Sequence, residues 1–128
     1  MQPRTLLHTA ALLVAVAASG AAAAHHSYAR FDRCRLFTVV GEVEHIRWGN
    51  PHVELTVHGI DDVSYSVIWL NLQQMARAGV LPTTLAVGDR VEVTATRQLE
   101  ERPRVLALPT QIWRPKDGWR WSQPPQGC

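Results

Sequence analysis

The fold is decided by residues 37–48, which read FTVVGEVEHIRW. Apolar residues occupy every second position in the first half of this stretch, a period that is typical of a β-strand with one buried face. After Glu44 the pattern changes parity, because Ile46 and Trp48 now carry the apolar positions. A shift of one residue turns every side chain to the other face, so we predict a β-bulge or a sharp bend at Glu44-His45. A long first strand with such a bend favours a small barrel.

The same period of two marks later strands, and one helix interrupts them. Asn71 is a good N-cap and Gly79 stands where a C-terminal glycine is expected, which predicts a short helix of about two turns. The later strands are expected at 52–58, 63–69, 91–96 and 105–108. This order predicts an all-β fold, a small five-stranded OB-like Greek-key barrel with one short helix between strands three and four. Another small barrel or a sandwich is the alternative.

The first 24 residues differ in composition from the rest, since they hold nine of the fifteen alanines. A basic Arg4, an apolar run over residues 6–18 and small residues up to Ala24 indicate a secretory signal peptide. The run of about 13 residues is shorter than the roughly 18 that a membrane span needs, and no other segment is long and apolar enough. We predict a signal peptide at 1–24, a mature N-terminal segment at 25–35, the barrel at 36–112 and a Trp-rich C-terminal tail at 113–128.

The charge of the mature chain restricts its partners. Its 104 residues carry 12 Lys and Arg against 11 Asp and Glu, without charge runs. Binding to a phosphate backbone needs a basic footprint that this balance does not supply. The sequence therefore predicts one small domain that does not bind nucleic acid.

The chain has two cysteines, Cys34 and Cys128. In an exported protein the simplest interpretation is one intramolecular disulfide. It would close a loop of about 93 residues and, on the chain-entropy model, stabilise the fold by about 4–5 kcal/mol. A disulfide-linked dimer and a mixed disulfide are the alternatives. The spacing matches neither a redox motif nor a zinc site.

The segments HHSYARFD (25–32), GEV (41–43), WGNPHV (48–53) and LAVGDRV (85–91) occur in this order along the chain. Their combination resembles a known family. Its members are uncharacterised exported bacterial proteins that begin, after a signal peptide, with a His-His-Ser and aromatic motif. They then carry a Gly-x-Val strand ending in Trp-x-Asn-Pro-His. The resemblance implies a periplasmic all-β domain of unknown function, and it does not extend to the tail or to the cysteine pair.

The histidines near the mature start are candidate metal ligands. Cleavage after Ala24 would make His25 the first residue, whose amine and imidazole can chelate one ion. Cleavage after Ala23 would instead place His26 third, where amine, two backbone amides and imidazole form a square-planar site. Both arrangements suit Cu(II), and the second also suits Ni(II). His52 is a candidate third ligand; alternatively, it is hydrogen-bonded at a strand start and the N-terminal pair is solvated.

Trp48, Asn50 and His52 form a candidate ligand-binding corner at the barrel mouth, with an aromatic platform, an amide and an imidazole. The alternative is structural: Trp48 closes the barrel end and Asn50 caps the turn before Pro51. Three tryptophans at 113, 119 and 121 alternate with basic residues. They would either stack on sugars or lipid headgroups, or cover the open side of the barrel.

No nucleophile triad, phosphate loop or nicotinamide fingerprint is present, and the adjacent carboxylates at 61–62 and 100–101 are expected to diverge. The sequence therefore predicts a non-enzymatic binding module, periplasmic or secreted, whose partner is an envelope protein or a small ligand. The alternative function is a periplasmic copper-binding protein that uses the N-terminal histidine pair.

Overall fold

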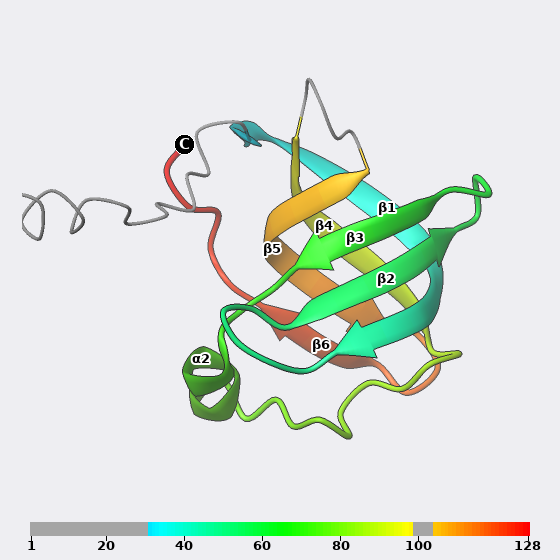
Figure 1. Ribbon diagram of the computed structural model, residues 1–128. Helices are drawn as coiled ribbons and strands as arrows, with labels where there is room; N and C mark the ends of the chain where they lie inside the picture. Colours follow the sequence, from blue (N-terminus) through cyan, green and yellow to red (C-terminus); the bar gives the residue numbers. More distant parts are fainter. Residues whose placement is uncertain (1–30, 99–103) are drawn as a thin grey trace, which may run out of the picture.

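The computed structural model describes residues 31–98 and 104–128 of the chain (Figure 1). The predicted signal peptide, His25 and His26 lie outside the described residues. In chain order the elements are β1 (Phe31–Arg47), β2 (Glu54–Gly59), β3 (Ser64–Ile68), α2 (Leu72–Arg77), β4 (Arg90–Gln98), β5 (Val105–Arg114) and β6 (Trp119–Ser122).

The first five strands close into a ring. β1 pairs antiparallel with β2 on one side and with β4 on the other, and β2 pairs with β3. β5 completes the ring, because it pairs antiparallel with β4 and parallel with β3. These pairings confirm the predicted all-β barrel with one short helix between the third and fourth strands. Figure 1 shows α2 and the β2–β3 turn at opposite ends of the β2–β3 hairpin.

The predicted bulge lies in β1. Its register with β2 passes from Val43↔Val57 directly to His45↔Thr56, so Glu44 is the extra residue. Val43 is fully buried, whereas Glu44 and His45 are both exposed. The bulge therefore places two consecutive polar side chains on the outer surface of the barrel.

The predicted helix is also confirmed. The Asn71 side chain accepts a hydrogen bond from Gln74 N, and the Gln74 side chain accepts one from Asn71 N, which forms a capping box. Gly79 follows the helix with φ +68°, a conformation that glycine adopts at no steric cost. Met75 is fully buried and fixes the helix against the barrel core.

The C-terminal part forms more structure than a tail. β5 continues to Arg114, and after a turn β6 pairs antiparallel with it, so the sheet has a sixth strand beyond the five predicted. Burial explains the extra strand. Ile112 is fully buried, and the ring of Trp121 packs edge-on against Trp69 with centroids 5.2 Å apart. Trp121 therefore covers the barrel, as one of the two interpretations of the tryptophans requires.

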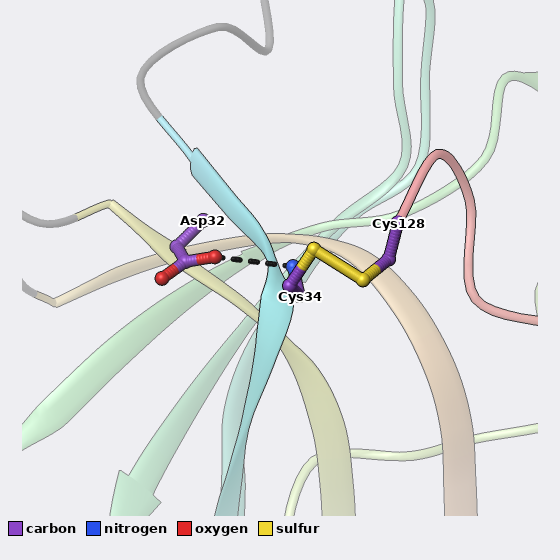
Figure 2. The surroundings of a disulfide bond; sticks show 3 residues. All are labelled: Asp32, Cys34 and Cys128. Atoms are coloured by element: carbon purple, nitrogen blue, oxygen red, sulfur yellow. Dashed lines mark hydrogen bonds between the residues drawn. A yellow bond between two sulfur atoms is a disulfide. The ribbon is translucent and has the colours of Figure 1, made fainter.

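The two cysteines form the predicted intramolecular disulfide (Figure 2). It joins Cys34 on β1 to Cys128, with Cα atoms 4.9 Å apart. Cys34 N donates to Asp32 Oδ1 at 3.1 Å. The stretch around Cys34 lies outside the regular ladder, since the register with β4 passes from Phe31↔Gln98 to Leu36↔Thr96. The disulfide thus holds the least regular part of β1.

Candidate functional site

The predicted corner Trp48-Asn50-His52 is the connection between β1 and β2, and it contains a cis Asn50-Pro51 peptide bond. Arg47 crosses the base of the connection. Its Nη2 donates to the carbonyl of His52 at 3.3 Å and to Glu54 Oε1 at 2.5 Å. The hydrogen bond with Glu54 raises the pKa of Arg47. The corner is therefore held by a bond across its two flanking strands.

Asn50 serves the fold. Its Oδ1 accepts a hydrogen bond from Leu72 N, in the first turn of α2, at 3.3 Å. The first backbone N–H groups of a helix have no partner within the helix, so this bond ties the corner to α2. One of the two lone pairs of this oxygen is therefore used within the fold.

Trp48 and His52 are both half-buried, and Trp48 packs against the hydrophobic core. Trp48 also lines a hollow of about 10 Å³ with Trp69, Val80 and Leu81, which is room for no more than about one water molecule. The structure brings the three predicted residues into one turn. Trp48 has core contacts, and Asn50 bonds to α2 rather than within the turn before Pro51, while contact with a ligand stays a prediction.

The predicted metal ligands are not brought together within the described residues. His25 and His26 lie outside them, and His52 lies in the β1–β2 connection, two residues before β2 begins at Glu54. Across residues 31–98 and 104–128, no group of three His, Cys, Asp or Glu side chains could hold a metal ion. Copper binding by the N-terminal pair remains a prediction about residues beyond this range.

The structure reveals a side-chain network around His58 on the outer face of β1 and the β2–β3 hairpin. His58 Nδ1 lies 3.3 Å from Ser64 Oγ and 3.7 Å from Glu44 Oε1. Its Nε2 lies 3.2 Å from Asp62 Oδ1. Ser64 Oγ in turn donates to Glu44 Oε2 at 2.8 Å. We call these four residues the histidine network.

The hydrogen bonds decide the chemistry of this network. Ser64 gives its one proton to Glu44, so its oxygen accepts from His58 rather than donating to it. A serine nucleophile would need the opposite direction of transfer. Carboxylates lie beside opposite ring nitrogens, Glu44 near Nδ1 and Asp62 near Nε2. The same placement prevents both carboxylates from sharing one metal ion with His58.

Sequence reasoning missed the network because its members come from four places in the chain. Glu44 is the extra residue of the bulge, His58 is the penultimate residue of β2, Asp62 lies in the turn and Ser64 begins β3. The predicted bulge at Glu44-His45 was the one available signal. Only the β1–β2 register, which pairs Glu42 with His58, shows that the bulge faces this histidine.

Beside the network, Ile60 stands exposed in the β2–β3 turn, with 74% of its surface open to solvent. Two hollows along β1 are both lined by it. One, of about 180 Å³, is also lined by Glu42, His58 and Arg90. The other, of about 130 Å³, is also lined by residues 37–40, Asp61 and Tyr65. We call the histidine network together with Ile60 the turn surface.

A hydrogen bond joins two of the side chains that line the smaller hollow. The Tyr65 hydroxyl donates to Asp61 Oδ2 at 2.6 Å, which lowers the pKa of Asp61 and raises that of Tyr65. The Tyr65 ring packs against Phe37 with centroids 5.7 Å apart, and the Arg97 guanidinium lies 4.7 Å from the Phe37 centroid. The hollow is thus bordered by two aromatic rings and a carboxylate, and a cation lies over one of the rings.

Charged residues at the β5–β6 hairpin serve the fold. Burial alone would raise the pKa of Asp89, but hydrogen bonds from Lys116, Ala86 N and Arg114 lower it to about 2. Arg114 Nη1 lies 2.8 Å from Asp89 Oδ2 and also donates to the carbonyl of Thr84. These bonds attach the loop before β4 to the hairpin, and we assign them no ligand.

The two remaining tryptophans of the hairpin are half-buried beside arginines. The Arg114 guanidinium lies 5.6 Å from the ring centroid of Trp119, and that of Arg120 lies 5.5 Å from the ring centroid of Trp113. Trp119 also packs against the core cluster. Both rings therefore already have cationic partners from the same hairpin.

Fold and surface together define a small disulfide-linked all-β barrel with an exposed polar network at one end. A model of a family of unknown function, DUF6152, matches residues 12–104. The match covers well over half of the chain, so the protein belongs to this family. It ends before β5, and therefore β5, β6 and Cys128 lie beyond it.

No curated protein matches the chain. No solved structure matches it either. Within the described residues, none of the helices is long and apolar enough to cross a membrane.

Proposed function

We propose that the protein is a non-enzymatic binding module of the bacterial cell envelope, and that it contacts its partner protein or small ligand through the turn surface. One observation carries the proposal: Ile60 stands exposed between two hollows and next to the hydrogen-bonded network of His58. An apolar group beside fixed polar groups is the usual composition of a recognition site.

The sequence and the disulfide support placement in an oxidising compartment, the periplasm or the cell exterior. Residues 1–24 have the pattern of a signal peptide, and a disulfide between Cys34 and Cys128 persists where thiols are not kept reduced. An envelope protein or a small envelope ligand is therefore the expected partner.

Site-specific photocrosslinking in the living cell tests the proposal. p-Benzoylphenylalanine replaces Ile60 in one variant, and Val87, which is 65% exposed and outside the turn surface, in the control. We expect a discrete crosslinked species at position 60 that is absent at position 87 and is identified by mass spectrometry. Native mass spectrometry of the purified protein serves for a small ligand.

A third variant with the crosslinker at Trp48 compares the turn surface with the predicted corner. A species formed at position 48 but not at position 60 would place the partner at the corner and contradict the turn surface. If neither position forms a species and no ligand is bound, the binding-module proposal fails as a whole.

A further inference from the structure

The direction of the backbone hydrogen bonds in β1 shows which residues face the smaller hollow. The carbonyl of Val40 accepts from Ile60 N at 2.9 Å, on the β2 side. Val43 instead bonds through both its N–H and its carbonyl to the loop before β4, at 2.9 and 2.8 Å. Successive residues of a strand direct their backbone groups to alternate sides. Thr38 therefore directs its N–H and carbonyl to the same side as Val40.

Within residues 31–98 and 104–128, no strand pairs with Thr38 on that side. The β1–β2 register begins at Gly41↔Gly59. After Ile60 the β2–β3 turn leads away from β1, and Asp62 N donates to the carbonyl of Gly59. In the described parts of the chain, no backbone hydrogen bond reaches Thr38 from this side. Thr38 also lines the hollow of about 130 Å³. Residues 36–38 thus form an open strand edge, which we call the β1 edge.

The surroundings of the β1 edge identify what would cover it. Leu36 and Ile60 are two of the large apolar residues that the barrel leaves exposed, at 45% and 74%. A strand edge offers unpaired donors and acceptors at the spacing of another strand, and apolar residues beside it receive alternate side chains. An extended peptide supplies both features, which a compact small molecule does not.

The charges beside the β1 edge favour an acidic segment. Arg97 lies over Phe37, and among the described residues it has no carboxylate partner in an ion pair. Arg104, which is exposed, also lies close enough to Tyr65 to act on it electrostatically. Asp61 accepts from the Tyr65 hydroxyl and keeps its negative charge, so two arginines and one carboxylate act on Tyr65. Among the described residues, an acidic side chain at this end of a bound peptide would therefore meet an excess of positive charge.

We propose that the β1 edge is the docking site of an extended, acidic segment of a partner protein, which adds as a short strand beside residues 36–38 and places an apolar side chain against Ile60. The inference rests on the proposed function and names the class of its partner. The segment is short, because the Val40–Ile60 bond closes the edge on one side and the stretch around Cys34 leaves the ladder on the other.

Amide hydrogen exchange followed by NMR tests the open edge first. We expect the Thr38 amide of the free protein to exchange at least about tenfold faster than that of Val39, whose backbone groups face β4. Equal protection of the two amides would show that the edge is closed and would overturn the proposal.

The second step uses blocked octapeptides in which Val, Leu or Phe alternates with Thr, each made with one terminal Asp or one terminal Lys. We expect the Asp series to bind at least about fivefold more tightly and to slow exchange at Thr38 by at least about tenfold. Ile60→Asp should abolish binding, and Val87→Asp, the same change at another exposed apolar residue, should not. Thr38→Pro, which removes the N–H, should also abolish it.

The outcomes separate this inference from the proposed function. If position 60 crosslinks a partner but no peptide protects Thr38, the binding module stands and the strand-addition mode fails. Binding that survives both Ile60→Asp and Thr38→Pro also overturns the mode. A concentration-dependent dimer that Thr38→Pro dissolves would assign the edge to a second copy of the chain and overturn the acidic partner.

Discussion

Gly41 lies where β1 passes between β2 and β4, opposite Gly59 on one side and Val91 on the other. A Cβ atom at this position would lie 2.1 Å from the carbonyl oxygen of His58, which is backbone and cannot rotate away. Two glycines facing each other let β1 and β2 approach closely at this point. The same contact places His58 and the turn surface at a fixed distance from β1.

We therefore expect Gly41→Ala to destabilise the protein by about 3 kcal/mol, because the backbone of β2 must move to admit the methyl group. Gly49→Ala is the matched control, since a Cβ there meets only Arg47 Nη1 at 3.7 Å. Urea unfolding followed by tryptophan fluorescence measures both. Equal stability of the two variants would show that β1 and β2 can separate without cost.

At the scale of elements, Asp89 joins the loop before β4 to the β5–β6 hairpin. Its side chain is buried, and Lys116, Ala86 N and Arg114 all donate to it. The folded state lowers the pKa of this carboxyl from 3.8 to about 2. A carboxyl with a lowered pKa stabilises the fold at pH values above its unfolded pKa, and this stability is lost as the pH falls through the folded pKa.

Acid unfolding should show this loss directly. Between pH 5 and pH 2 we expect the wild type to lose about 2 kcal/mol from Asp89, whereas Asp89→Asn, already less stable at pH 7, should lack this part of the dependence. Urea titrations at several pH values measure the difference. Parallel pH profiles for the two proteins would contradict the assignment to Asp89.

The elements also show what the sequence could and could not predict. Alternation predicted the first strands, and the parity change after Glu44 predicted the bulge, because both patterns are local. β6 was missed as a strand because four residues between a turn and two prolines carry too short a pattern. The histidine network was missed for a different reason: Glu44 and Ser64 meet only through the pairing of β1, β2 and β3.

For the whole molecule, the main long-range constraint is the disulfide between Cys34 and Cys128, which are separated by 94 positions. The chain leaves β6 with Gln123 bonded to the carbonyls of Thr110 and Pro109. The chain then runs on to Cys128, which the disulfide joins to Cys34 on β1 (Figure 2). The disulfide therefore encloses nearly the whole barrel in one covalent loop. Its reduction acts mainly on the unfolded chain, which gains conformational freedom, and removes few contacts from the folded protein.

We expect the Cys34→Ser/Cys128→Ser variant to unfold with a free energy lower by about 4 kcal/mol, the chain-entropy value for a loop of this length. The barrel should nevertheless form, because the strand pairings that close the ring do not depend on the disulfide. Urea unfolding of oxidised wild type, reduced wild type and the double variant measures the effect. The reduced wild type and the double variant should have the same free energy of unfolding. A loss below about 1 kcal/mol would mean that the unfolded chain gains little freedom when the loop opens.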